Sequence, residues 1–157
     1  MRALPDLAAL VAALHAGGVR HVVIGGVAVA AHGFLRGTAD VDLVPEPDPD
    51  NLLALGNALV RLDARLPLAG GRPFAHAEHG RVLRQGGNLT LDTVDGGLDI
   101  VQRAPGLPSF ATLDADAVPT EILGTPIRVC SLEHLRAMKR AADRPIDRAD
   151  LDALGEG

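Results

Sequence analysis

The sequence predicts an α/β (or α+β) protein in which a mixed β-sheet is flanked by helices, with a short helical segment at the C-terminal end. Short β-branched apolar runs alternate with stretches of helical period, and Gly-Gly or Gly/Pro turns separate them. Hydrophobic residues make up 47% of the chain and charged residues 22%, which is typical of a folded globule. A length of 157 residues predicts one domain, residues 1–157.

In the first half of the chain, helices are predicted at residues 5–16, 27–32 and about 50–66. Strands are predicted between them, at residues 19–24 and 39–44. Leucines at i, i+3 and i+7 indicate the first helix, and Gly17-Gly18 ends it. The run at 19–24 is β-branched and apolar, as in a buried strand. Asp50 is the expected N-cap of the third helix.

The second half is predicted to begin with an irregular segment at residues 67–80, followed by three strands at 81–85, 89–94 and 98–101. A short helix is predicted at 109–114, and two strands on either side of Gly124-Thr125. Two closing helices are predicted at 132–142 and 147–154. The turn Asp95-Gly96-Gly97 predicts a hairpin. Ser131 is expected to cap the first closing helix, and Pro145 to interrupt the pair.

Composition excludes several classes of function. The net charge of −5 argues against a broad nucleic-acid-binding surface, and the absence of Trp and Tyr argues against a stacking platform. A single cysteine, Cys130, excludes an internal disulfide and a multi-thiolate zinc site and predicts a small buried apolar side chain. The longest apolar run, residues 22–31, is too short to span a bilayer, and Pro5 and Asp6 interrupt any signal-peptide pattern. We therefore expect a cytoplasmic protein with no membrane partner.

Asp40-Val41-Asp42 places two carboxylates on one face of a predicted strand. Residues two apart share a face, with Cα atoms about 6.6–7 Å apart, and the apolar Val41 and Leu43 fix the opposite face in the core. Adjacent anions repel each other unless a cation bridges them, and carboxylate oxygens suit Mg²⁺ or Mn²⁺. The pair predicts a divalent-metal site; the alternative is two solvated aspartates on an edge strand.

Gly25-Gly26 joins a predicted strand to a predicted helix. Free backbone N–H groups at a helix N-terminus form an anion site, and the missing side chains let a phosphate approach the backbone. The alternative is an ordinary tight turn. Together with the aspartate pair, the turn predicts a phosphate cradle beside a metal site.

This arrangement resembles the nucleotidyltransferase superfamily that includes DNA polymerase beta. The signature stands here as Ile24-Gly25-Gly26, a spacer of 13 residues and Asp40-Val41-Asp42. Further parts of the chain are similar to small bacterial members of the abortive-infection and toxin–antitoxin type: Arg36-Gly37-Thr38, Leu98-Asp99-Ile100-Val101, Ser131 to Leu135, Lys139, Arg144, Asp147 and Asp150. The resemblance covers a motif core at about 18–104 and a C-terminal helical motif at about 131–154.

The resemblance implies that an NTP is the substrate and that two Mg²⁺ or Mn²⁺ ions are bound. Asp40 and Asp42 would bridge the two metals, and Asp99 would hold the metal on the nucleophile side and help to deprotonate the acceptor hydroxyl. Asp92, in a neighbouring alternating strand, is the second candidate for the third carboxylate. Residues expected to contact the nucleotide or its phosphates are Gly25, Gly26, Arg36, Thr38 and Lys139, with Arg144, Asp147, Asp150 and His32 as further candidates.

Lys139 is the only lysine of the chain. At about 100° per residue it falls between leucines on the apolar stripe of its predicted helix. We expect its ammonium either to reach water along its stem or to emerge in the cleft beside the phosphates. Asp147 is equally well explained as a first-turn acid of the last helix.

Three histidines and one arginine each admit more than one interpretation. His76 and His79 would be zinc ligands, solvated loop residues or part of the acceptor site. His32 would contact substrate or end its helix, and Arg36 would pair with a phosphate or with a carboxylate.

Three functions are compatible with these residues. The leading one is transfer of a nucleoside monophosphate from an NTP to a hydroxyl of RNA, such as tRNA, or of protein, in a toxin–antitoxin or phage-defence role with a cognate partner. The second is a catalytically degenerate member that binds a nucleotide or a partner. The third, a small-molecule transferase of the aminoglycoside type, is less favoured because 157 residues leave no room for a separate substrate domain.

Overall fold

The computed structural model describes residues 6–34, 37–38, 40–122 and 124–155. Within them, eight strands form one mixed sheet in the order β4-β3-β5-β6-β2-β1-β8-β7, which confirms the predicted α/β class. The strands are β1 (His21–Ile24), β2 (Asp40–Pro45), β3 (Arg65–Leu66), β4 (Arg72–Pro73), β5 (Leu89–Thr93), β6 (Gly96–Ile100), β7 (Val118–Ile122) and β8 (Thr125–Val129). The helices are α1 (Leu7–Ala16), α2 (Gly25–Ala31), α3 (Pro49–Arg61), α4 (His79–Arg84), α5 (Phe110–Ala115), α6 (Leu132–Ala142) and α7 (Pro145–Ala153), with a 3₁₀ turn at Pro67–Ala69.

The Asp-x-Asp segment lies on β2, between two other central strands of the sheet. β2 runs antiparallel to β1 and parallel to β6. Val41 lies opposite Leu98, and both side chains are buried, as expected for the apolar face of two central strands. The alternation then turns the aspartates of β2 to the other face.

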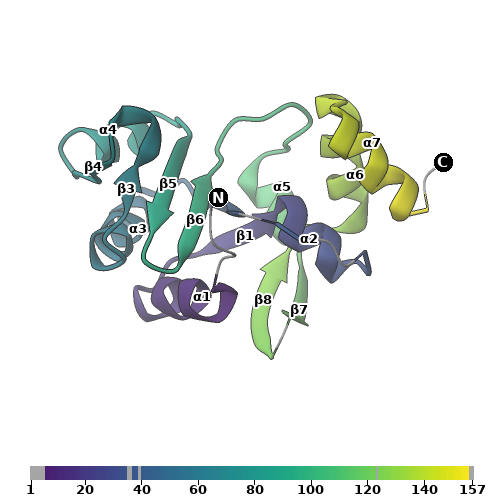
Figure 1. Cartoon of the computed structure of the whole chain (residues 1–157), viewed down its shortest axis with the longest axis horizontal. Coiled ribbons are helices and arrows are strands. Elements are labelled where there is room, and N and C mark those ends of the chain that lie inside the picture. The colour runs from purple at the N-terminus through teal and green to yellow at the C-terminus, as the bar shows by residue number, and fades with distance from the viewer. Residues whose placement is uncertain (1–5, 35–36, 39, 123, 156–157) are drawn as a thin grey trace.

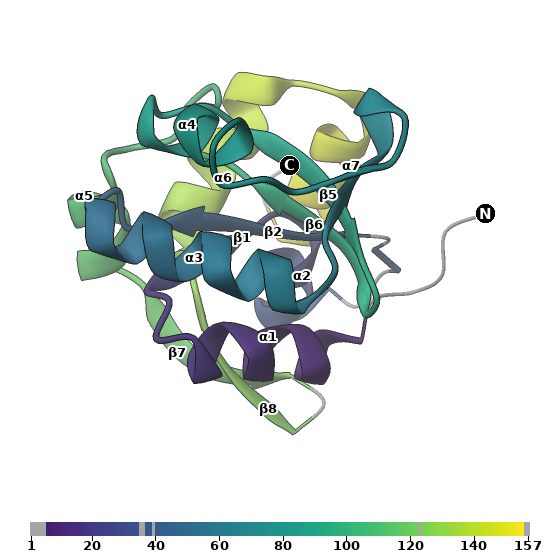
Figure 2. The ribbon, with the colours of Figure 1, turned by 90° about the vertical axis from the view of Figure 1, so that its left-hand side faces the viewer.

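Helices cover the sheet unevenly. Figure 2 shows α3 lying across the sheet with α1 beside it, and α3 contacts both α1 and β2. In Figure 1, α6 and α7 pack together at the end of the molecule opposite α3 and α4. The segment between β6 and α5 arches between these two ends. This leaves the polar face of β2 and β6 toward α6.

Side-chain caps fix where several helices begin. Ser131 accepts a hydrogen bond from the backbone of His134 (3.1 Å) and starts α6, as predicted. The N-cap of α3 is Asp48 rather than Asp50, because Pro49 occupies the first helical position and Asp48 accepts from the Asp50 amide.

Two predicted elements are wrong. The helix predicted over 50–66 ends at Arg61: Asp63 adopts a left-handed conformation (φ 50°), and the chain turns back into β3. The strand predicted over 81–85 is helix α4, since a single buried Leu83 within five residues cannot distinguish a period of 2 from one of 3.6.

The β5–β6 hairpin is tighter than predicted. Gly96 already pairs with Thr93, so only Val94 and Asp95 form the turn. Residues 67–80, predicted to be irregular, contain the short strand β4 and the 3₁₀ turn. No helix among the described residues is long and apolar enough to cross a membrane.

Candidate active site

A cavity of about 460 Å³ opens between the polar face of the central strands and the C-terminal helices. Gly25, Asp42 and Asp99 line its sheet side, and Leu135, Met138 and Lys139 of α6 line the opposite side. The cavity therefore brings the Gly-Gly turn, two of the predicted carboxylates and the C-terminal motif to one place.

Asp42 and Asp99 stand directly opposite each other on parallel strands. Asp42 pairs in register with Asp99, and Asp40 with Gly97, so all three carboxylates belong to the same face. Asp92 of β5 lies across from Gly97, and it is not among the described residues that line the cavity. The register therefore places Asp99, not Asp92, beside the Asp-x-Asp pair.

The electrostatics of this carboxylate pair are unfavourable without a cation. Burial, the charge of Asp99, the hydrogen bond with Asp99 and the charge of Asp40 together raise the pKa of Asp42 to about 7, against the opposing effect of Lys139. Asp42 therefore gives up its proton only near neutral pH. One oxygen of Asp40 and one of Asp99 are inaccessible to solvent.

Gly25 approaches Asp42 more closely than any side chain would allow. Its φ is 69°, in the left-handed region, and a Cβ built on it would lie 2.1 Å from Asp42 Oδ2. Glycine is therefore required twice at this position, by the backbone conformation and by the carboxylate.

The Gly25→Ala variant is expected to lose function far beyond its cost in backbone strain. The new methyl group must displace the Asp42 carboxyl, so we expect loss of metal and nucleotide binding. Gly18→Ala is the matched control, because Gly18 has nearly the same φ (70°) and nothing within 4 Å of an added Cβ. Calorimetric titration with Mg-ATP compares the two; equal binding by both variants would contradict the role of this contact.

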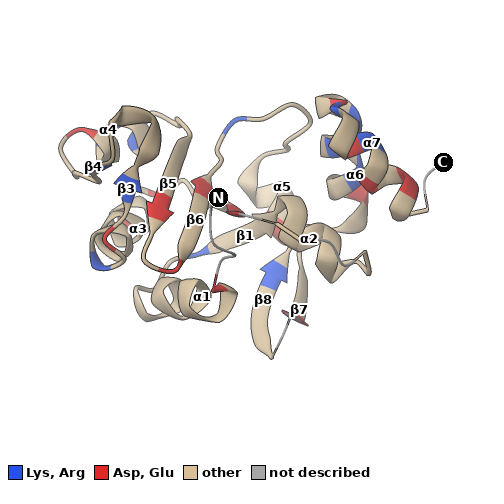
Figure 3. Ribbon diagram, viewed as in Figure 1, with Lys and Arg blue, Asp and Glu red and all other residues tan. Residues whose placement is uncertain are grey.

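Lys139 lies in the cavity wall as a buried ion-pair centre. Its side chain is 7% exposed, and its Nζ lies 3.2 Å from Asp147 Oδ1 and 2.9 Å from Asp150 Oδ2. Asp147 and Asp150 of α7 are both fully buried, on a helix pair that carries charges of both signs (Figure 3). The lysine therefore does not reach water along its stem, and two carboxylates already compensate its charge.

Arg144 joins the same cluster from the start of α7. Its guanidinium donates to both carboxylate oxygens of Asp147 (2.7 and 3.1 Å), and its backbone N–H donates to Asp147 as well. Burial by itself would raise the pKa of Asp147, but the hydrogen bonds from Arg144 and Lys139 outweigh it and hold this pKa below its usual range. Asp147 is thus a first-turn acid, as its position in the sequence suggested. The Arg144 side chain is 66% exposed and lines the cavity.

The remaining predicted residues lie around the site rather than in it. Gly26 is buried in the first turn of α2. The Thr38 hydroxyl donates to the Asp40 carbonyl (2.9 Å), which holds the start of β2. His32 ends α2, and its Nε2 donates to the Cys130 carbonyl (2.8 Å). Arg36 lies outside the described residues.

His76 and His79 have packing and hydrogen-bond contacts within their own segment. His79 is buried, and its Nδ1 accepts from the Ala75 amide (2.9 Å), while the His76 ring packs edge-on against Phe74. Cys130 is buried as predicted, and burial raises the pKa of its thiol to about 12.

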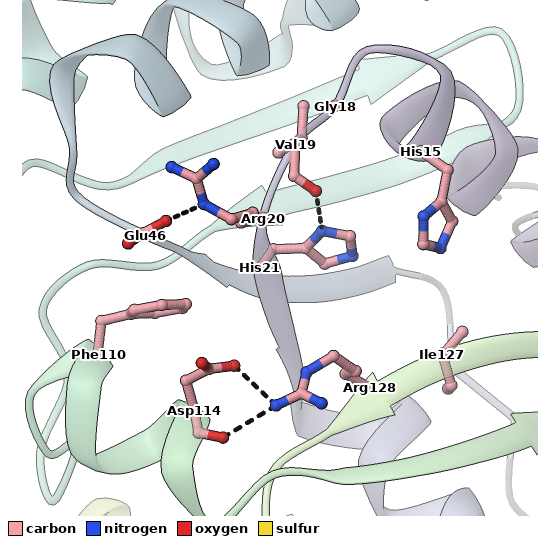
Figure 4. A pocket seen from close by; sticks show the side chains of 10 residues that line it. All are labelled: His15, Gly18, Val19, Arg20, His21, Glu46, Phe110, Asp114, Ile127 and Arg128. Carbon is pink, nitrogen blue, oxygen red and sulfur yellow. Dashed lines mark hydrogen bonds and ion pairs between the residues drawn. The ribbon is translucent and has the colours of Figure 1, made fainter.

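A second cavity, of about 620 Å³, lies at the other end of β1 (Figure 4). Its two arginines are engaged, Arg20 with Glu46 and Arg128 with Asp114 (2.9 Å). Its floor includes His21, whose pKa is lowered by burial. The facing carboxyls found in the first cavity have no counterpart among its lining residues, so we place the active site in the first.

The three aspartates have the donor chemistry that a divalent ion requires. Within the described part of the chain, no three His, Cys, Asp or Glu side chains are already gathered around a metal position. Asp42 and Asp99 nevertheless already meet, and the raised pKa of Asp42 reflects a concentration of negative charge that a cation relieves. The residues thus fit Mg²⁺ or Mn²⁺, which would replace the proton on Asp42.

Sequence analysis missed two polar residues of the cavity, Asn88 and Arg103. Asn88 precedes β5, and Arg103 follows β6. Neither belongs to a motif or to a periodic face, so the only available signal was that Arg103 lies four residues after Asp99.

Solved structures share this fold at low sequence identity. A lincosamide antibiotic adenylyltransferase, LnuA, solved with lincomycin, is similar with a TM-score of 0.64 and 15% identity over 94% of this chain and 92% of its own. The antibiotic-resistance factor ANT(2'')-Ia is similar with a TM-score of 0.57 and 20% identity, over 93% of this chain and 80% of its own. A Thermotoga maritima protein described as a nucleotidyltransferase is similar with a TM-score of 0.54 and 15% identity, over 94% of this chain and 87% of its own.

No protein-family model and no curated protein sequence matches the chain. The structural similarity nevertheless shows that the chain has the nucleotidyltransferase fold, as its motifs led us to expect.

Proposed function

We propose that this protein is a metal-dependent nucleotidyltransferase that moves a nucleoside monophosphate from an NTP to a hydroxyl group, with RNA or a protein as the acceptor. The observation that carries the proposal is the register that sets Asp42 against Asp99 beside Gly25 in one cavity. A fold shared with nucleotidyltransferases supports it.

Asp40, Asp42 and Asp99 would hold the two metal ions. When bound, such ions stabilise the attacking and leaving oxygens of an in-line displacement. The protein's own residues then divide the remaining tasks. The Gly25 backbone, which lines the cavity beside Asp42, would face the triphosphate, and Asp99, on the strand farther from Gly25, faces the acceptor. The acceptor oxygen bonds to the α-phosphorus, its proton passes to the Asp99 carboxylate, and pyrophosphate leaves.

Size does not exclude a small-molecule acceptor. Sequence analysis disfavoured one because no separate substrate domain fits, but the lincosamide adenylyltransferase is matched over 92% of its length by this chain. An enzyme of comparable size therefore acts on an antibiotic, and a small molecule becomes the second candidate acceptor.

We also keep the proposal that the protein acts in a toxin–antitoxin or phage-defence pair in the cytoplasm. Support comes from the C-terminal string, in which Lys139, Arg144, Asp147 and Asp150 form one connected cluster. A catalytically degenerate, nucleotide-binding protein is the alternative. Three carboxylates on one face argue against it.

Incubation with each α-³²P-labelled NTP and Mg²⁺ tests the function. Parallel reactions contain total RNA, a protein lysate, or a panel of hydroxyl-bearing antibiotics. We expect label in one acceptor class and its loss with EDTA. Mg-dependent NTP binding without transfer to any class would instead favour the degenerate alternative.

A further inference from the structure

The segment that follows β6 is a fixed wall of the active-site cavity; we call residues 101–109 the strap. Asn88 Oδ1 accepts from the backbone N–H groups of Gln102 (2.7 Å) and Arg103 (3.0 Å), and Asn88 Nδ2 donates to the Arg103 carbonyl (2.8 Å). The Gln102 side chain donates to the carbonyls of Leu83 and Gly87 (2.9 Å each). One end of the strap is therefore held by five hydrogen bonds.

The other end of the strap rests directly on α6. A Cβ added to Gly106 would lie 2.9 Å from the Ala137 carbonyl oxygen and 3.1 Å from the Met138 Cα, and its φ of 76° also favours glycine. Backbone thus packs against backbone at this point. In Figure 1 the segment between β6 and α5 forms an arch, and residues of the strap, among them Arg103 and Pro105, line the cavity.

Arg103 is held in this wall without a carboxylate partner. Its Nη2 donates to the Gln85 carbonyl (2.8 Å), and its guanidinium lies over Gly86, where an added Cβ would be 3.2 Å from Nη2. Within the described residues no carboxylate pairs with it, whereas Lys139 and Arg144 are paired with Asp147. A carbonyl orients a guanidinium but does not neutralise it, so Arg103 keeps a full charge and free donors at the cavity.

The strand order decides which substrate Arg103 faces. Gly25 follows β1, and the order β6-β2-β1 puts β2 between it and the strap. Arg103 leaves β6 four residues after Asp99, on the side away from the turn proposed for the triphosphate. Its donors therefore lie on the acceptor side.

We infer that Arg103 is a specificity-determining residue that binds a phosphate of the acceptor, next to the hydroxyl that attacks. This inference rests on the proposed function. Its ligand is the phosphate on the terminal nucleotide of an RNA acceptor. A cationic antibiotic would be repelled by the positive charge of Arg103 at this position.

Calorimetric titration of acceptor mimics tests this role. The protein is first saturated with Mg²⁺ and α,β-methylene-ATP, and adenosine or AMP is then added; both carry the 3′-hydroxyl, but only AMP carries a phosphate. The wild-type protein is expected to bind AMP at least tenfold more tightly than adenosine. Arg103→Gln is expected to lose that preference. Arg103→Lys is expected to keep part of it, because lysine keeps the positive charge but lacks the paired N–H donors of the guanidinium.

Matched measurements separate the possible failures. Arg65→Gln, at an exposed arginine of β3 paired with Asp63, should retain the AMP preference. A loss of methylene-ATP affinity in Arg103→Gln with the AMP preference intact would assign Arg103 to the triphosphate and overturn the inference. A wild-type protein with no AMP preference would also overturn it, although nucleotide binding would still support the proposed function. Absence of Mg-dependent binding of methylene-ATP would instead overturn the proposed function itself.

Discussion

The Asp42→Asn variant is expected to lose transfer activity by about a thousandfold or more and to unfold at a higher temperature than the wild type at pH 8. The loss follows because the variant removes one of the two facing carboxyls on which the reaction depends. The higher unfolding temperature follows because ionisation of Asp42 destabilises the folded protein. A pKa raised from 3.8 to about 7 means that the folded state favours the protonated form.

The sign of the pH dependence follows from this shift. The contribution of Asp42 to stability is fully present below about pH 4 and is lost as the pH rises toward about 7. Asn mimics the protonated carboxyl, so its advantage grows over the same interval and stays constant above it. At about 1.4 kcal/mol per pH unit, the gain at pH 8 is at most about 4 kcal/mol.

Thermal unfolding in EDTA from pH 4 to 8 measures this advantage, and the labelled-NTP assay measures the loss. Adding Mg²⁺ should stabilise the wild type and not the variant, since the ion relieves the repulsion that Asn has already removed. Asp92→Asn, on the same sheet but outside the cavity lining, is the control for both readouts. A pH-independent difference between Asp42→Asn and the wild type would show that Asp42 is not the group described here.

Lys139→Met is expected to destabilise the protein by about 3–5 kcal/mol. Removal of the ammonium takes an ion-pair partner from both buried aspartates, and a buried charge that loses its partner is costly. Urea unfolding measures the loss. The triple variant Lys139→Met, Asp147→Asn, Asp150→Asn should recover much of it, because the buried carboxylates are gone and Arg144, which loses its partner, is 66% exposed to solvent.

A surface pair gives the contrast. Arg148→Met breaks the exposed ion pair with Asp143 (2.8 Å) and should change stability little. If Lys139→Met were as harmless as Arg148→Met, the buried cluster would not be a stabilising unit. Activity of the triple variant then shows whether Lys139 also serves the nucleotide.

The central strands could be predicted from the sequence because each carries its own signal. β-branched runs and alternating aspartates mark β1 and β2, and Leu98 and Ile100 fix the direction of Asp99. Helix α6 was equally clear, with a capping serine and a full apolar stripe. The motif then joined these elements into one site.

Contacts between distant segments could not be predicted in this way. The end of α3 depends on a left-handed Asp63, and α4 is too short to show a period. The place of the strap depends on Asn88 hydrogen bonds across 14 and 15 residues. A helical wheel put Lys139 on the apolar side, but its partners lie on the next helix.

The burial of Lys139 also makes it a reporter. It is the only side-chain amine in the sequence, so all other positive side chains are guanidinium or imidazole groups that acylating reagents leave largely untouched at neutral pH. An amine-reactive label can therefore modify a side chain of this protein only in molecules whose α6–α7 pair has opened. The rate at which Lys139 is labelled therefore measures how often the α6–α7 pair opens.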